Sequence, residues 1–179
     1  MKNLILLLAI TLICSCCNND DDNNEPTNPI DQLPPATQTG ANTAGCLVNG
    51  EAFLPNNQSV QPLVCHYLDG EDFALGVSKK VNNIYYNIYI YIGNTELQVN
   101  QTYQLMEYGG DSKFGEYIIN HESYPSPNYY STSSTITGEL TITHHDFNNA
   151  FLSGTFWFDA LNSDGEIIEV REGRFDMHY

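Results

Sequence analysis

Histidine side chains are candidates for chemistry, because an imidazole can bind a metal ion or transfer a proton. The only local cluster is His144-His145-Asp146. A metal site needs three or four converging ligands, yet adjacent side chains on a strand point to opposite faces of a sheet. The cluster is therefore typical of a polar strand end, and we assign no metal ligands.

Two acidic turns carry the oxygen atoms that calcium prefers as ligands. They read Asp69-Gly70-Glu71-Asp72 and Asn162-Ser163-Asp164-Gly165-Glu166. Neither has the Asp-x-Asp-x-Asp-Gly spacing of an EF-hand loop. We favour hairpin turns at both places and keep a calcium site as the alternative.

Paired carboxylates can hydrolyse a glycosidic bond, and the fold rather than the sequence spacing sets their separation. Four candidates fall in expected strands, namely Glu139, Asp159, Glu169 and Asp176. The chain has 22 Asp and Glu residues, so such a set is expected by chance. It has neither a Gly-x-Ser-x-Gly elbow nor a glycine-rich phosphate loop. We assign no catalytic residue and no cofactor, and keep a glycan-acting hydrolase as an alternative function.

A stripe of tyrosines is the feature that best suits ligand binding. In the segment 84–92 (IYYNIYIYI), Tyr85, Tyr89 and Tyr91 share one face at period two, and isoleucines share the other. Aromatic rings on a flat sheet face offer a sugar or a peptide contact area at low entropy cost. The alternative, which we favour at this stage, is that both faces are covered and the hydroxyls reach water at the rim.

Cys46 and Cys65 are the two cysteines of the expected domain. A disulfide between them would close a loop and stabilise the fold by roughly 3 kcal/mol in the chain-entropy model. The equal alternative is a pair of buried free thiols that behave as small hydrophobic side chains.

The elements that position these residues are predicted to be strands. Period-two patterns run through 84–92, 136–143, 151–160 and 167–179. Asn-Gly and Asp-Gly pairs, which favour tight hairpins, lie between such segments. Many short strands at close spacing predict one all-β domain, an antiparallel β-sandwich or barrel of about nine strands. Its last three strands, near 136–144, 150–161 and 166–178, are expected to form a C-terminal β-meander.

The N-terminal residues predict a signal peptide. Lys2 precedes an apolar run of ten residues, 4–13, which is too short to span a bilayer because spanning takes about 20. The run ends in Leu12-Ile13-Cys14-Ser15-Cys16, which resembles the lipobox of bacterial lipoproteins. We expect cleavage after residue 15 and a lipid on the sulfur of Cys16, which would anchor the protein to a membrane.

Residues 16–41 are expected to form a flexible acidic tether, because they are rich in Asn, Asp, Pro and Thr and poor in large apolar side chains. Asp20-Asp21-Asp22 resembles the surface-export signal of Bacteroidetes lipoproteins, and a solvated spacer is the other interpretation. The net charge of −16 argues against nucleic acid as a partner. The remaining residues, 42–179, form the expected β domain.

Two stretches resemble an uncharacterised family of Bacteroidetes lipoproteins. From Thr39 the chain reads TGANTAGCLVNGEAFLP, and near its end SGTFWFDALNSDGEIIEVREGRFDMHY. Family members open with Thr-Gly-Ala-Asn-Thr-x-Gly-Cys-x-(Val/Ile)-Asn-Gly and close with a Gly-x-Phe-x-Phe-Asp … Gly-x-Phe-Asp meander; the matching stretches are Thr39–Gly50 and Gly154–Asp176. The resemblance implies a lipoprotein with one β domain, an Asn49-Gly50 hairpin and core positions at Phe156, Phe158 and Phe175. It carries over no activity.

The leading expectation is therefore an outer-membrane lipoprotein whose β domain binds a glycan or a protein without catalysis, with surface exposure left open. A glycan-acting hydrolase and a structural component of the cell envelope are the alternatives.

Changing the cysteine that is expected to carry the lipid tests the anchor. Cys16→Ser should leave a soluble or unprocessed precursor, because no sulfur is present at that position to accept the lipid. Membrane fractionation and fatty-acid labelling measure the effect. A variant that still partitions with membranes and still takes up label contradicts the lipoprotein interpretation.

Overall fold

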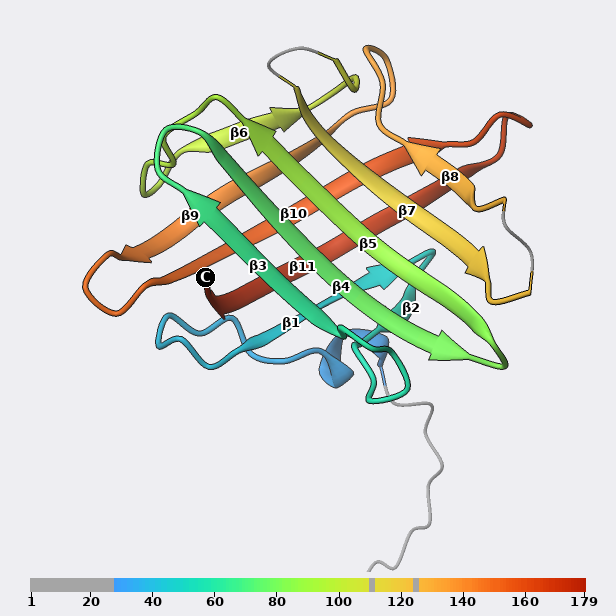
Figure 1. Ribbon diagram of the computed structural model, residues 1–179, viewed down its shortest axis with the longest axis horizontal. Coiled ribbons are helices and arrows are strands. Elements are labelled where there is room, and N and C mark those ends of the chain that lie inside the picture. The colour runs from blue at the N-terminus through green and yellow to red at the C-terminus, as the bar shows by residue number, and fades with distance from the viewer. Residues whose placement is uncertain (1–27, 110–111, 124–125) are drawn as a thin grey trace, which may run out of the picture.

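Eleven antiparallel strands form one continuous sheet in the computed structural model, which describes residues 28–109, 112–123 and 126–179 (Figure 1). The signal peptide, Cys16 and Asp20-Asp21-Asp22 lie outside these described residues. A short 3-10 helix, η1 (Pro29–Gln32), precedes the sheet. The strands are β1 (Thr43–Val48), β2 (Glu51–Phe53), β3 (Leu63–Leu68), β4 (Asp72–Val81), β5 (Ile84–Gly93), β6 (Thr102–Leu105), β7 (Lys113–His121), β8 (Asn128–Ser131), β9 (Gly138–Asp146), β10 (Phe151–Leu161) and β11 (Ile167–His178).

The sheet folds over on itself into two layers. Its strand order is β2-β1-β11-β10-β8-β7-β5-β4-β3, and β9 pairs with both β10 and β6. One layer contains β3, β4, β5 and β7, and the other contains β1, β11, β10 and β9, whose strands cross the first set steeply (Figure 1). The short strand β8 joins them by pairing with β7 and with β10. Strands β2 and β3 end the path at opposite edges, so the sheet is not closed into a barrel.

The predicted all-β class is confirmed, with eleven described strands where the sequence indicated about nine. Strands β2, β6 and β8 are only three or four residues long, too short for a period-two pattern to stand out. No helix among the described residues is long and apolar enough to span a bilayer.

The core lies between the two layers and follows the predicted alternation. On β5, Ile88, Ile90 and Ile92 are fully buried and the tyrosines between them point outward. The C-terminal meander is also confirmed, because β9, β10 and β11 pair in succession. The aromatic positions implied by the family resemblance are buried in it, namely Phe156, Phe158 and Phe175.

Tight turns occur where the sequence places asparagine and glycine. Asn49 and Gly50, between β1 and β2, have φ values of 50° and 82°. Asn82 and Asn83, between β4 and β5, have φ values of 50° and 63°. Positive φ at both central residues gives a turn whose twist matches that of the flanking strands.

The buried carboxylate of Asp176 joins the start of the folded chain to its last strand. Asp176 is 1% exposed and accepts hydrogen bonds from the amides of Thr39, Gly40 and Ala41, from the hydroxyls of Thr37 and Thr39, and from the hydroxyl of Ser153 on β10. Burial alone raises the pKa of this carboxyl. The bonds from Thr39, Thr37, Ala41 and Ser153 outweigh burial and hold the pKa well below its usual range.

Residues 28–41, which composition alone assigns to a flexible tether, therefore pack against the domain. Leu33 is buried beside η1, and Thr37, Thr39, Gly40 and Ala41 bond to Asp176. The folded unit begins before residue 42 because the acceptor for these polar groups lies on β11.

Asp176→Asn tests this junction. We expect the free energy of unfolding to fall by about 2–4 kcal/mol at neutral pH, because an amide leaves some of the buried donors without an acceptor. The folded pKa is depressed, so the contribution is present above the unfolded pKa of about 4 and is lost as the pH falls through the folded pKa. The difference in the free energy of unfolding between wild type and variant should therefore become smaller in acid. Urea unfolding at neutral pH and at about pH 3 measures both effects.

Asp164→Asn, in an exposed turn, is the matched control and should change stability by less than about 0.5 kcal/mol. Equal stability of the Asp176 and Asp164 variants would contradict the role of Asp176 in joining residues 37–41 to β11.

Candidate functional site

Three tyrosines lie on the outer face of the layer formed by β3, β4, β5 and β7. Tyr85, Tyr89 and Tyr91 are half-buried and point away from the core, opposite Ile88, Ile90 and Ile92. No described segment crosses in front of β4 and β5 (Figure 1). The outward rings of the tyrosine stripe are thus partly open to solvent, and no described segment covers this face of the strand. We call this surface the tyrosine face.

The backbone register aligns a row of outward positions across the tyrosine face. Val64, Gly76, Tyr89, Glu116 and Ser131 are successive partners on β3, β4, β5, β7 and β8. Gly76 has no side chain, so the row has a gap between Val64 and the ring of Tyr89. A shallow groove of about 410 Å³ lies there, and its other walls include Val60, Tyr85 and Ile118. Most of the wall surface of the groove is apolar, and its polar wall residues are Ser59, Gln61, Ser78 and Asn87.

A second hollow lies around Phe114 and shares Tyr89 with the groove. The ring of Phe114 lies 6.0 Å from that of Tyr89, 5.6 Å from Tyr91 and 5.2 Å from Tyr108. Tyr108 is largely exposed. The tyrosine stripe is therefore part of a wider aromatic cluster. Sequence reasoning did not find Phe114 and Tyr108, because only pairing of β5 with β7 brings Phe114 opposite Tyr91.

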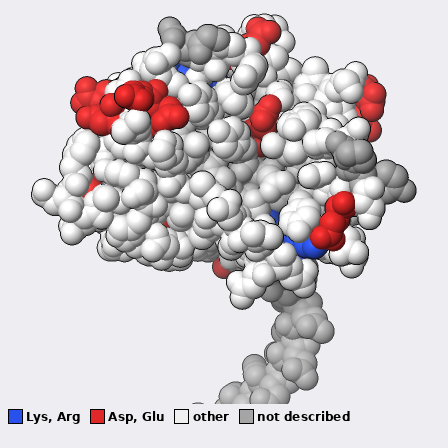
Figure 2. Space-filling model, viewed as in Figure 1, with Lys and Arg blue, Asp and Glu red and all other residues white. Residues whose placement is uncertain are grey.

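Charge is sparse on the tyrosine face and gathers at its ends. Figure 2 shows a largely uncharged surface with carboxylates at the upper left, over the turn between β3 and β4; this turn contains Asp69 and Glu71, and Asp72 begins β4. Within the face, burial raises the pKa of Glu116, and the hydroxyl of Ser131 that donates to it partly offsets this. Lys80 lies 4.7 Å from the ring of Tyr85 and pairs with Glu122 at 3.1 Å.

The outer face of the other layer holds the single tryptophan and both arginines of the chain. Trp157 on β10 is 36% exposed. Its indole N–H donates to Glu139 on β9, with 3.2 Å between Nε1 and Oε2. A groove of about 580 Å³ lies over Trp157, with Glu139, Thr141, Thr155, Arg171 and Arg174 among its walls. We call it the Trp157 groove.

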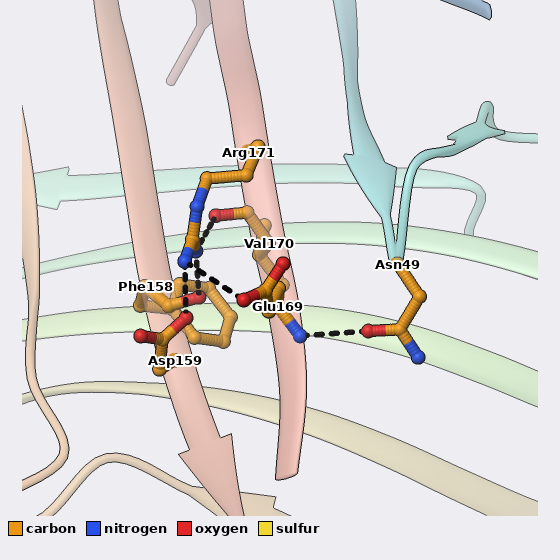
Figure 3. Close-up of polar contacts among 6 residues, drawn as sticks. All are labelled: Asn49, Phe158, Asp159, Glu169, Val170 and Arg171. Carbon is orange, nitrogen blue, oxygen red and sulfur yellow. Dashed lines mark hydrogen bonds and ion pairs between the residues drawn. The ribbon is translucent and has the colours of Figure 1, made fainter.

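Arg171 is held by both strands of the β10–β11 pair (Figure 3). Its Nη1 donates to the backbone carbonyls of Phe158 and Val170 at 3.2 and 3.0 Å. Its Nη2 lies 2.6 Å from Asp159 Oδ1 and 3.6 Å from Glu169 Oε1. Asn49 in turn accepts the backbone N–H of Glu169. The guanidinium group is thereby fixed 5.5 Å from the Trp157 ring.

A β-bulge places both arginines on the same face. Residues three apart on a regular strand point to opposite faces. Opposite Trp157, however, β11 contains one extra residue, and Glu172 there has a φ of 54°. This left-handed conformation costs a non-glycine residue about 1–2 kcal/mol. The extra residue shifts the alternation by one position, so that Arg171 and Arg174 both point outward.

The carboxylates considered for hydrolysis do not form one site. Asp176 accepts six hydrogen bonds beneath residues 37–41. Asp159 and Glu169 pair with Arg171. Glu139 accepts N–H groups from Trp157 and from Gln104.

The histidine cluster and the two acidic turns have structural contacts: the Tyr67 hydroxyl donates to Asp69, and the backbone amides of Asp164 and Glu166 donate to Asn162. His144 stacks on Phe151 and His145 on Phe147, while Asp146 accepts the amides of the following turn. Within residues 28–109, 112–123 and 126–179, no group of three His, Cys, Asp or Glu side chains is placed to hold a metal ion.

Cys46 and Cys65 are free thiols, so the structure contains no bridge between them. Cys46 is fully buried on β1, and Cys65 packs against the core from β3. Burial raises the pKa of each thiol to about 12. Both are therefore protonated apolar groups at neutral pH.

Comparison with protein families gives one match. The family described as domain of unknown function DUF6252 covers residues 76–177. The chain belongs to this family. The DUF6252 segment runs from Gly76 on β4 to Met177 on β11 and includes the three tyrosines of the tyrosine face and the walls of the Trp157 groove named above. The expectation of an uncharacterised family is confirmed. Comparisons with curated proteins and with solved structures found no match.

Two variants of Glu172 test the bulge. Glu172→Gly should change the free energy of unfolding by less than about 1 kcal/mol, because glycine accepts positive φ. Deletion of Glu172 should cost more than about 3 kcal/mol or prevent folding, because it turns one arginine toward the core. Urea unfolding followed by circular dichroism compares the two. A deletion variant as stable as Glu172→Gly contradicts this role of the extra residue.

Proposed function

We propose that this DUF6252 protein is a lipid-anchored, non-enzymatic binding protein of the cell envelope, and that its tyrosine face binds a polypeptide partner. The observation that carries the proposal is the aromatic cluster of the outer face, where half-buried Tyr89 and Tyr91 and exposed Tyr108 surround the buried ring of Phe114, beside a groove over Gly76. Contiguous exposed apolar surface on a small domain marks an interaction site.

The chemistry of the tyrosine face favours a polypeptide over a sugar. Val60 is 86% exposed, and together with Val64 and Ile118 it gives the groove apolar walls. Such a groove suits an inserted aliphatic or aromatic side chain, and of its polar wall residues Ser78 already donates to Asn87 at 2.6 Å. Tyrosines at the rim of an apolar patch can accept and donate hydrogen bonds to a partner backbone. The carboxylates at the end of the face would favour basic residues in the partner.

The engaged state of the carboxylates supports binding rather than hydrolysis. A general acid needs a proton to donate, and a nucleophile needs a free oxygen at the substrate. Asp159 is paired with Arg171 at 2.6 Å, and both oxygens of Glu139 accept side-chain N–H groups.

A lipid on Cys16 would place the domain at a membrane surface, with the first folded element beginning at Pro29. The net charge of −16 would keep the domain away from anionic headgroups. We infer an outer-membrane position, with Asp20-Asp21-Asp22 as the feature that favours export to the cell surface.

A peptide array tests the proposed partner class. The full-length protein in detergent should bind a subset of peptides that contain both aromatic and basic residues. Tyr89→Ala and Gly76→Val should each weaken binding by about tenfold or more, equivalent to about 1.4 kcal/mol. A Cβ at position 76 would meet only the side chain of Val64, at 3.4 Å, so the Cβ of the valine extends into the groove at an ordinary contact distance.

Phe147→Ala is the matched control, because Phe147 is an exposed aromatic residue in the β9–β10 turn. Its affinity should equal that of the wild type. Binding that survives both Tyr89→Ala and Gly76→Val, or a protein that binds no peptide on the array, overturns the proposal and leaves a structural role.

A further inference from the structure

The Trp157 groove differs in chemistry from the tyrosine face. It lies on the other layer and has polar walls, Glu139, Thr141, Thr155, Arg171 and Arg174, around one partly exposed indole ring. Its volume of about 580 Å³ falls within the range of about 300–1,000 Å³ that is usual for small-molecule sites.

The side chains of the groove are held in place by one another. Glu139 accepts the Trp157 N–H at 3.2 Å and the Gln104 amide at 2.8 Å. The Thr141 hydroxyl bonds to that of Thr102 at 2.8 Å. Because these contacts already order the side chains, binding would require little further ordering of them.

The arginines do not make the groove a site for anions. Arg171 lies 2.6 Å from Asp159 and 3.6 Å from Glu169, and Arg174 pairs with Glu172 at 3.3 Å. Two guanidinium groups thus face four carboxylates when Glu139 is included. An anionic ligand would have to displace one of these carboxylates, so the balance favours a neutral ligand.

The remaining hydrogen-bonding capacity of the groove suits hydroxyl groups. The exposed Thr155 hydroxyl has no partner among the residues that the structure describes, and it can both donate and accept. The carboxylate oxygens of Glu139 each retain a lone pair beyond the bond already made. Thr155 neighbours Arg174 on one strand and Thr141 on the other. Polar groups therefore surround the indole on several sides.

We propose that the Trp157 groove binds a neutral pyranose sugar of a glycan. The part of the indole surface that the Arg171 guanidinium leaves open packs against the C–H face of the sugar ring, where aromatic side chains provide contact area. Glu139, Thr155 and Thr141 bond to the ring hydroxyls. This site is independent of the polypeptide site proposed for the tyrosine face.

Fluorescence of the single tryptophan reports directly on this groove, because Trp157 is the only tryptophan in the chain. The full-length protein in detergent is titrated with neutral oligosaccharides of glucose, galactose, mannose and N-acetylglucosamine, and with oligogalacturonate as the acidic counterpart. A saturable change with at least one neutral oligosaccharide, and none with oligogalacturonate, is the expected result.

Variants locate the binding. Trp157→Ala, followed by calorimetry, should weaken affinity by about tenfold or more, and Thr155→Val by about threefold or more. Thr155→Val removes only an exposed hydroxyl, so it keeps the test valid if Trp157→Ala fails to fold. Tyr89→Ala, on the opposite layer, should bind the sugar as the wild type does. Absence of any response to the neutral panel, tighter binding of oligogalacturonate, or unchanged affinity in both groove variants would overturn the proposal.

Discussion

The buried carboxylate of Asp176 is the interaction on which the arrangement of this domain depends. It lies on β11, which pairs with β1 on one side and β10 on the other. Its oxygens accept hydrogen bonds from residues 37–41 and from Ser153 on β10. An ionised carboxylate is stable in such a place only if donors replace the lost water. The same bonds therefore satisfy the charge and fix the chain as it enters β1.

The two layers have different outer surfaces, the tyrosine face on one and the Trp157 groove on the other, and these surfaces depend on different features of the strands. The tyrosine face follows from regular alternation, because burial of Ile88, Ile90 and Ile92 forces Tyr89 and Tyr91 outward. The Trp157 groove depends on a break in that alternation. Local strain at a bulge is often associated with function, because the surrounding structure must hold it in place. The two surfaces differ accordingly, one apolar and aromatic, the other polar around a single indole.

Sequence patterns predicted those parts of the fold that local alternation determines. The predictions of the strand around Ile88 and of the C-terminal meander were correct, because a half-buried strand has a strict period of two. The groove at Trp157 was missed, because the extra residue at Glu172 breaks that period; the rarity of tryptophan and arginine in this chain was the available signal. The composition of residues 28–41 predicted a polar tether. Sequence patterns could not show that these residues are bound, because the carboxylate that accepts their hydrogen bonds, Asp176, lies as far as 139 residues away along the chain.

Hydrogen exchange at the backbone amides of Thr39, Gly40 and Ala41 tests the role of Asp176 most directly. These amides belong to no strand, so their protection depends on the carboxylate that accepts them. Exchange measured by NMR at neutral pH should give them opening free energies close to those of the β10 and β11 amides. Exchange at the rate of an unstructured chain, while β10 and β11 remain protected, would contradict the account.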